Sequence, residues 1–419
     1  MKCVRILLEV DPQMNCYNAA DAACSKGHLD IIKFLVEHQP QIILAASSGT
    51  AERGLLQAAI KCDKKAKLAV LSYLLEKGLS PNMLHPPDYA CPLALVLSQE
   101  GTGLFNWLSS AWTLDVVNLL LRAGADVSKL VEFPSKTSPS FCALKTYVTG
   151  KPSADVFKEL VDAGLDLTVR DQHTGDTLLH LRAEKSVDNR FQIEASTDFD
   201  VFLCNIIHEW QKKLNTLANN NEDNGGHSQS LIDSPNFNGA TPLMFAVMNA
   251  KVPLVEALLK CGVDLNRPAF GHPSILHWLI SGKYGGVRNR AGKIMKLFLQ
   301  HGAATDKVFP KTGRTLLHQA CYKGITGIIR QLLTIGRMDP NCTIPDPEGG
   351  DPITPLMLAI AENDAETVEL LIKQGAFVGE SERKAVLHHI QERDLTEWRS
   401  LLGIPQELSC SSDSEGPAN

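Results

Sequence analysis

The sequence predicts an all-α solenoid of about ten stacked helix–turn–helix units joined by short hairpin turns. A triplet of the type Thr-Pro-Leu or Thr-Leu-Leu begins at Thr241, Thr315 and Thr354, and a glycine follows each threonine 21 residues later. Each interval contains a short apolar segment with an alanine, then a polar break, then a leucine doublet. Equal spacing of the same signals indicates a repeated structural unit, here one with two short helices.

Each residue type has a physical reason for its place in the unit. The threonine hydroxyl caps a helix N-terminus, and proline fits the first helical turn because its missing N–H would be unpaired there. The closing glycines can adopt the left-handed conformation that ends a helix, so they are predicted to terminate the second helix of their units. These are Gly262, Gly336 and Gly375.

This pattern resembles the ankyrin repeat, which combines a Thr-Pro-Leu-His helix start with a Leu-Leu-x-x-Gly-Ala-Asp second half. The resemblance extends over nearly the whole chain, to about residue 403. Its strongest matches lie at residues 119–127, 174–180, 236–266, 312–341 and 354–376. Three histidines fall on the histidine of the motif, and for them the resemblance implies hydrogen bonds between neighbouring repeats. They are His180, His277 and His318.

We expect four segments along the chain. Residues 1–217 are degenerate repeats that begin with a partial repeat, 218–234 a flexible insertion rich in Asn and Gly, 235–403 better-matched repeats with closing helices, and 404–419 a disordered, acidic, Ser-rich tail. Further insertions are expected in loops at residues 98–111, 182–199 and 281–292, because loop closure entropy rises slowly with length. Whether the solenoid continues across 218–234 or bends there is left open.

The first residues look like an incomplete unit. Cys3 to Val10 resembles a second helix whose first helix is missing. Two explanations stay open: the chain is truncated relative to the functional protein, or this stub is itself a makeshift cap, and we favour truncation. A bare solenoid end would expose apolar surface.

Composition narrows the class of protein and partner. The chain is 44% hydrophobic and 21% charged with a net charge of -6, which excludes disorder of the whole chain and disfavours nucleic acid or an anionic membrane as partner. Eleven cysteines stand singly, so we expect reduced thiols and no disulfide-linked partner. With no signal peptide and no apolar run of membrane-spanning length, a cytoplasmic or nuclear location without membrane insertion is predicted.

Possible chemical sites do not reach a recognisable signature. Cys204 and His208 lie four residues apart, but a structural zinc needs four ligands, and we favour a buried Cys beside a partly exposed His. Gly292-Lys293 lacks the spacing of a phosphate-binding loop, so the Gly-rich segment from Lys283 is read as a basic loop that either meets an acidic partner or is simply solvated. We predict no enzyme activity, no cofactor and no metal.

Binding is therefore expected on the surface of the repeats. The resemblance implies that the adaptable positions are the hairpin tips and the exposed end of the first helix of each unit. Carried onto this sequence they are Phe237, Asn238, Met248, Asn249, Lys311, Thr312, Arg314, Tyr322, Lys323, Ile353 and Glu362, with Trp278 on the same face. Aromatic residues, Met and Arg are typical of interface cores, although an aromatic residue on a short helix can equally serve packing, Trp278 above all.

Two functions from different classes fit this surface. The leading hypothesis is a non-enzymatic scaffold or adaptor that binds another protein, such as an acidic or extended segment laid against Lys311, Arg314 and Lys323. The alternative is a substrate-recruiting or regulatory region of a larger enzyme, such as a ubiquitin ligase, kinase or helicase-like protein.

Four side chains are candidates for modification. Asn82, Asn266 and Asn341 resemble asparagines that an intracellular hydroxylase modifies in ankyrin proteins, but we favour the simpler reading that asparagine tolerates the turn geometry there. Ser412 precedes Asp413 and lies near Glu415, a pattern typical of sites for acidophilic kinases.

Overall fold

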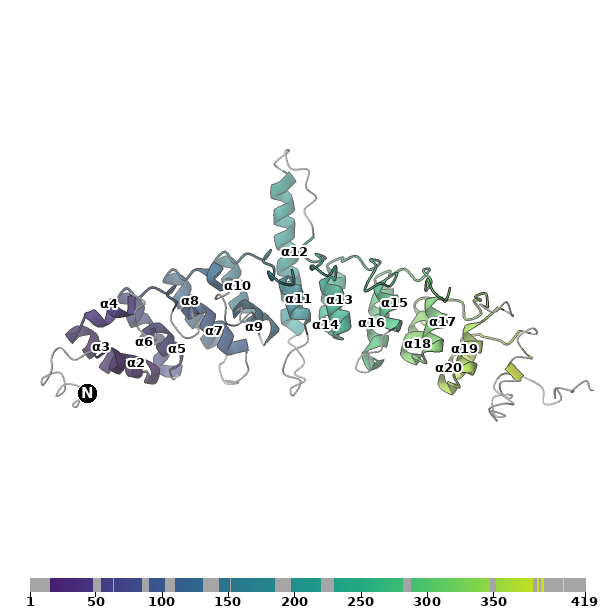
Figure 1. Cartoon of the computed structure of the whole chain (residues 1–419), viewed down its shortest axis with the longest axis horizontal. Coiled ribbons are helices and arrows are strands. Elements are labelled where there is room, and N and C mark those ends of the chain that lie inside the picture. Colours follow the sequence, from purple (N-terminus) through teal and green to yellow (C-terminus); the bar gives the residue numbers. More distant parts are fainter. Residues whose placement is uncertain are drawn as a thin grey trace, which may run out of the picture. The chain divides into compact units, whose positions relative to one another are not determined.

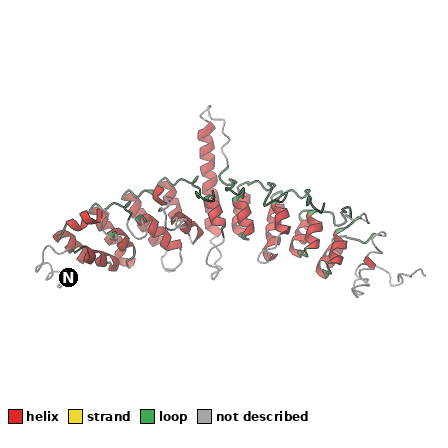
Figure 2. Ribbon diagram, viewed as in Figure 1, coloured by secondary structure: helices red, strands yellow, loops and turns green. Residues whose placement is uncertain are grey.

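The structure is a computed structural model and divides into two compact units, residues 1–242 and 243–419 (Figure 1). It describes residues 16–47, 54–62, 64–84, 90–101, 110–130, 143–150, 152–184, 197–219, 230–281, 288–346 and 352–379, with residues 383, 386, 387 and 402. Over these residues the regular structure is helical (Figure 2), and the only β-type pairing is in isolated bridges. The predicted all-α solenoid is confirmed.

In unit 1, residues 1–242, the helices pair in chain order, and α4 is an additional helix after the first pair. We name the first helix of each pair the inner helix and the second the outer helix. The elements are α2 (Tyr17–Lys26), α3 (Leu29–His38), α4 (Gln41–Ser47), α5 (Leu55–Ile60), α6 (Lys64–Glu76), α7 (Pro92–Gly101), α8 (Ser110–Arg122), a 3-10 turn (Val127–Leu130), α9 (Ala143–Thr149), α10 (Ala154–Asp162), α11 (Leu178–Ala183) and α12 (Thr197–Asn219). Inner helices pack on inner helices and outer on outer, which gives a continuous core between neighbouring pairs.

Helix α12 is much longer than its partner α11 and extends beyond the row of helix pairs (Figure 1). A buried ion pair fixes its base: Arg182 of α11 donates from Nε to Oδ1 of Asp200 at 2.6 Å, and both residues are 1% exposed. Arg182 also donates to the carbonyl oxygens of Val148, in the last turn of α9, and of Gly150, which directly follows that helix. One arginine of α11 therefore joins its own helix to α12 and to the end of α9 in the preceding helix pair.

Unit 2, residues 243–419, repeats the inner–outer pairing with greater regularity. Its helices are α13 (Pro242–Met248, which begins at the unit boundary), α14 (Val252–Lys260), α15 (Ile275–Ser281), α16 (Arg288–Gln300), α17 (Leu316–Tyr322), α18 (Thr326–Thr334), α19 (Pro355–Ala361) and α20 (Ala365–Lys373). The inner helices α15, α17 and α19 pack in sequence, and the outer helices α14, α16, α18 and α20 do the same.

The predicted helix caps are confirmed at two of the repeat starts in unit 2. The hydroxyls of Thr315 and Thr354 accept hydrogen bonds from the backbone N–H groups of His318 and Met357, three residues further on. These bonds satisfy N–H groups that have no partner within the helix.

One predicted helix end is wrong in detail. Gly262 and Gly375 have left-handed backbones, with φ of 78° and 91°, but Gly336 does not, and Arg337 has a φ of 48° in its place. Glycine is required at 336 for another reason: a Cβ atom there would lie 2.7 Å from the carbonyl oxygen of Leu332. The helix end is therefore displaced by one residue, and a non-glycine side chain bears the strain.

The insertions are shorter than expected, because helices begin or end inside them. Helix α7 continues to Gly101, α12 begins at Thr197 and α16 begins at Arg288. In the segment 218–234, α12 continues to Asn219 and the chain is described again from Ser230, with Ile232 and Ser234 buried. The stub at 3–10, the tail at 404–419 and nearly all of the closing helices lie outside the described residues.

Among the described residues, no helix combines the length and apolarity that crossing a membrane requires.

Candidate protein-binding surface

Three histidines, one in each of three repeats, join their repeat to the next by the same pair of hydrogen bonds. In unit 2, Nδ1 of His318 lies 2.8 Å from the Thr315 hydroxyl, and Nε2 lies 3.0 Å from the carbonyl oxygen of Ile353 in the next repeat. Because a carbonyl oxygen can only accept, Nε2 carries the proton and Nδ1 accepts from the hydroxyl. Burial lowers the pKa of His318, so the neutral ring is favoured.

The other two motif histidines make equivalent bonds. His180 bridges Thr177 to the carbonyl oxygen of Ala240, and His277 bridges Ser274 to that of Lys307. Burial lowers the pKa of both rings as well. The inter-repeat role implied by the resemblance is confirmed for all three histidines, and their ring nitrogens are engaged in the fold.

The three asparagines are also structural bridges. Asn82 donates to the carbonyl oxygen of Gly124 and accepts from the N–H of Asp126. Asn341 does the same with Gly375 and Phe377, and Oδ1 of Asn266 accepts from the N–H of Ala304. In each case the side-chain amide of an asparagine in one hairpin bonds to the backbone of the following repeat, which explains why asparagine occupies these positions. Ser412, the fourth modification candidate, lies outside the described residues.

A cluster of aromatic and basic side chains lies at the end of inner helix α17. The guanidinium carbon of Arg314 lies 4.1 Å from the ring centroid of Tyr322, which is 38% exposed, and Nζ of Lys323 lies 5.3 Å from the same centroid. Lys311 and Thr312, in the hairpin before α17, are both exposed. We name Lys311, Arg314, Tyr322 and Lys323 the aromatic–basic patch.

Cation–π stacking makes the patch both positively charged and apolar. A guanidinium stacked on a ring keeps its N–H donors available at the edges while the ring remains a flat apolar surface. Arg314, Tyr322 and Lys323 contact one another without a ligand, which reduces the entropy cost of binding one.

Trp278, predicted on the same face, is not an exposed surface residue. Only 6% of it is exposed, because the ring packs at 5.2 Å between centroids under Phe270 of the preceding hairpin. Helix α15 is short and apolar on nearly every side, so its tryptophan is covered on the side where the sequence predicted exposure.

Phe270 is the exposed aromatic residue of this repeat, and the sequence analysis missed it. It is 45% exposed and has a left-handed backbone with φ of 50°, in a tight turn where Ala269 and His272 exchange backbone hydrogen bonds. A bulky residue with positive φ is strained, and such strain is often found at functional sites. The signal in the sequence was Phe270-Gly271, a turn dipeptide with an aromatic where glycine or asparagine is usual.

The remaining predicted residues divide between the units. Phe237 and Asn238 belong to unit 1, where the Phe237 ring is 69% exposed and lies on the backbone of Gly175 in the previous hairpin. In unit 2, Met248, Asn249 and Ile353 are half-buried and Glu362 is exposed. Asn249 donates back to the carbonyl oxygen of Phe245, so its amide is partly engaged in its own helix end.

Two models of known families match this chain in the region of the patch. A model for three consecutive ankyrin repeats matches residues 269–382, and a model for one ankyrin repeat matches residues 238–267. Residues 238–267 and 269–382 are ankyrin repeats. A similar solved structure is the crystal structure of the ankyrin repeat domain of Bcl-3, described as a unique member of the IkappaB protein family. The two chains share 22% sequence identity with a TM-score of 0.40, and the alignment covers 68% of this chain and 100% of the Bcl-3 chain.

Ankyrin repeats are generally modules of protein–protein interaction, and proteins made of them are typically non-enzymatic. The described residues of this chain contain no group of three or more His, Cys, Asp or Glu side chains arranged to hold a metal ion. Cys204 is buried and His208 half-buried, which agrees with the packing interpretation of that pair.

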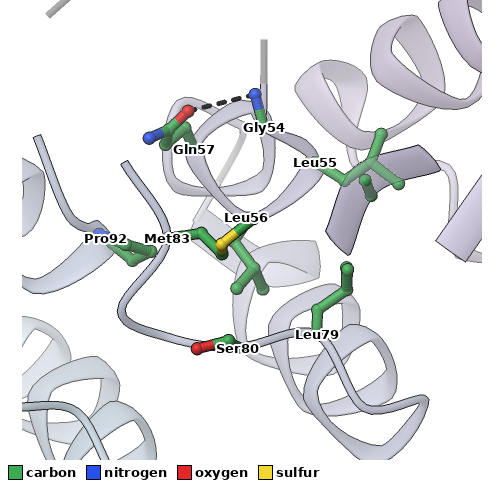
Figure 3. A pocket seen from close by; sticks show the side chains of 9 residues that line it. Gly54, Leu55, Leu56, Gln57, Leu79, Ser80, Met83 and Pro92 are labelled. Atoms are coloured by element: carbon green, nitrogen blue, oxygen red, sulfur yellow. Dashed lines mark hydrogen bonds between the residues drawn. The ribbon is translucent and has the colours of Figure 1, made fainter. Parts of the chain in front are cut away.

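A hollow in unit 1 offers no chemistry of its own (Figure 3). Its cavity volume is only about 10 Å³, room for about one water molecule, and it is lined by Ala46, Gly54, Leu55, Leu56, Gln57, Leu79, Ser80, Met83 and Pro92. The amide of Gln57 is engaged on both sides, because it accepts from the N–H of Gly54 and donates to the carbonyl oxygen of Ala90. No lining side chain titrates, so we place the candidate site at the aromatic–basic patch.

Proposed function

We propose that this ankyrin-repeat protein is a non-enzymatic scaffold or adaptor of the cytoplasm or nucleus, and that it binds an acidic, extended segment of another protein. The segment would lie along the hairpins and inner helices of unit 2, across Phe270 and the aromatic–basic patch. The observation that carries the proposal is the stacking of Arg314 on the partly exposed ring of Tyr322.

The chemistry of the patch favours an acidic peptide. Arg314 presents a planar fork that matches a carboxylate, and Lys311 and Lys323 add positive charge. Tyr322 and Phe270 supply apolar area at low entropy cost, as in the centres of known interfaces. An extended chain can place side chains on both, since each comes from a different repeat of the solenoid.

Affinity capture from a cytosolic lysate tests the proposal. Wild-type protein is compared with a variant in which Arg314, Tyr322 and Lys323 are all changed to Ala, and recovered proteins are quantified by mass spectrometry. The matched control changes Lys61, Arg122 and Lys158, three exposed cations of unit 1, to Ala. Circular dichroism verifies that all three proteins have the same helicity.

We expect at least one captured protein to be lost from the patch variant and retained by the control, with acidic segments enriched among such proteins. If the patch variant recovers the same proteins in the same amounts, the patch is ordinary surface and the proposal is wrong.

A further inference from the structure

Although the chain as a whole is acidic, residues 283–338 form a strongly basic segment, which we call the block. Residues 283–338 contain eleven Lys and Arg residues and a single acid, Asp306, in a chain whose net charge is -6. The block coincides with outer helices α16 and α18 and the inner helix α17 between them in sequence. The next repeat reverses the sign, because residues 339–379 contain eight acids and one lysine.

Among the described side chains of outer helix α16, every charged one is a cation on its exposed face, which also carries the neutral Gln300. Arg290, Lys293 and Lys296 are all exposed and follow one another at intervals of three residues, so they lie on one side of the helix. The opposite side holds the buried residues Ile294 and Phe298. Helix α18 adds Arg330, which is also exposed, and neither helix contains an Asp or Glu.

Close packing of the two helices brings these charges together. A Cβ atom at Gly292 of α16 would lie 3.0 Å from the carbonyl oxygen of Gly327 of α18, so the two backbones touch there. Lys296 is four residues beyond Gly292 and Arg330 three beyond Gly327, each about one turn further along its helix. Figure 1 shows α16 and α18 as neighbours. We name Arg290, Lys293, Lys296 and Arg330 the outer basic strip.

The strip lacks the counter-charges that other outer helices have. Glu256 pairs with Lys260 in α14, and Glu369 pairs with Lys373 in α20. Among the ion pairs between described residues, none includes a member of the outer basic strip. Like charges at helical spacing destabilise a helix, so the strip costs folding free energy that a bound anion would offset.

We propose that the outer basic strip is a second binding surface, which takes an acidic helical segment of a partner protein. Carboxylates spaced three and four residues apart on a helix match the spacing of the cations on α16. This surface lies on the outer helices and is separate from the aromatic–basic patch, so it does not rest on the function proposed above.

Other anionic partners fit the strip less well. The large exposed apolar side chains among the described residues do not include any on α16 or α18, and membrane-surface binding depends on such side chains. A nucleic acid duplex would need a longer run of cations, whereas the neighbouring helix α20 presents the exposed carboxylates Glu366 and Glu369. A short acidic segment confined to two repeats avoids both difficulties.

Fluorescence anisotropy with the full-length chain tests the strip. The probe is a labelled Ala-based peptide of about 18 residues with Glu at alternating intervals of three and four. The strip variant carries Lys293→Gln, Lys296→Gln and Arg330→Gln, and a control of equal charge carries Lys61→Gln, Arg122→Gln and Lys158→Gln. A third variant combines Arg314→Ala, Tyr322→Ala and Lys323→Ala.

We expect the strip variant to bind the probe about tenfold more weakly than wild type, and binding of wild type to weaken as salt rises. The control and the patch variant should each stay within about twofold of wild type. Arg330→Gln alone, measured in the same way, should weaken binding about twofold to threefold and serves if the triple variant loses helicity.

Three outcomes would overturn the proposal. Equal losses in the strip variant and the control would mean that only net charge matters. A larger loss in the patch variant would move the acidic probe to the inner face. Tighter binding of a DNA duplex, or of vesicles containing phosphatidylserine, than of the acidic peptide would assign the strip to phosphate-bearing ligands instead.

Discussion

Different polar contacts stabilise the interior of unit 1 and the interior of unit 2. In unit 1 the long helix α12 is anchored by a buried charged pair, Arg182 with Asp200, beside the neutral histidine bridge of His180, whereas in unit 2 the neutral bridge recurs at His277 and His318. The difference follows from sequence regularity. Similar repeats can share the same bond, as at His277 and His318, but a long helix without an equivalent in its neighbours needs an anchor of its own.

Breaking the anchor of unit 1 should have the largest effect. Arg182→Met leaves Asp200 buried without its partner, and loss of one member of a buried pair costs about 3–5 kcal/mol. We expect urea denaturation, followed by circular dichroism, to show a loss of this size. The double variant Arg182→Met, Asp200→Leu should recover most of it, because no charge remains buried. A loss below about 1 kcal/mol in the single variant would show that the pair does not anchor α12.

Breaking one bridge of unit 2 should cost less. His318→Ala leaves the Thr315 hydroxyl and the Ile353 carbonyl oxygen without their shared partner, at a cost of about 1–3 kcal/mol. The exposed His301→Ala is the matched control and should stay within about 0.5 kcal/mol of wild type in the same denaturation experiment. If the two variants lose the same stability, the bridge contributes nothing beyond an ordinary surface histidine.

Acid should weaken the bridges in a defined pH window. The pKa values of His180, His277 and His318 lie below the ordinary value of 6.5 in the folded chain, mainly because burial disfavours the charged ring. The unfolded chain therefore binds more protons than the folded chain as pH falls below 6.5, so the stability that these neutral rings give is present above that pH and is lost below it. We expect His318→Gln to reduce the pH dependence of the unfolding free energy between neutral and mildly acidic pH, whereas an unchanged slope would contradict this assignment.

The sequence was most informative where one residue type has one geometric use. Threonine caps followed from local chemistry and the histidine bridges from the family resemblance, and the structure places both in those contacts. The asparagines were expected only to suit the turn, and their bonds to the next repeat were not predicted. Trp278 and Phe270 were misjudged because exposure depends on how a hairpin tip folds back over the next helix, which spacing alone does not encode. The pairing of Arg182 with Asp200 was equally hidden, since its members lie 18 positions apart in the sequence on two different helices.

Arg337 allows a test of the displaced helix end of unit 2. Its backbone is left-handed, as are those of Gly262 and Gly375 at other outer helix ends, and its side chain is exposed. Arg337→Gly should therefore stabilise unit 2 by about 1 kcal/mol, measured as a rise in Tm. Gly262→Ala is the converse control and should destabilise by a similar amount. A fall in Tm with Arg337→Gly would mean that the arginine side chain stabilises this turn.

The smallest change in stability is expected at Phe270, where two terms oppose each other. Phe270→Gly relieves a left-handed backbone, worth about 1–2 kcal/mol, but removes a ring contact with Trp278 worth about 0.5–1.5 kcal/mol. The net change should thus be near zero in thermal denaturation. Phe270→Ala keeps the strain and loses the ring, so it should be less stable than Phe270→Gly. Equal stability of the two variants would show that the turn is unstrained, and the aromatic tip would then be explained by its packing on Trp278 alone.

If the glycine variant is as stable as wild type yet captures less of the partner bound at the aromatic–basic patch, the phenylalanine is retained for binding and not for folding. Phe237 of unit 1 sharpens the contrast, because it is not among the residues with positive φ and glycine there should bring no gain from strain relief.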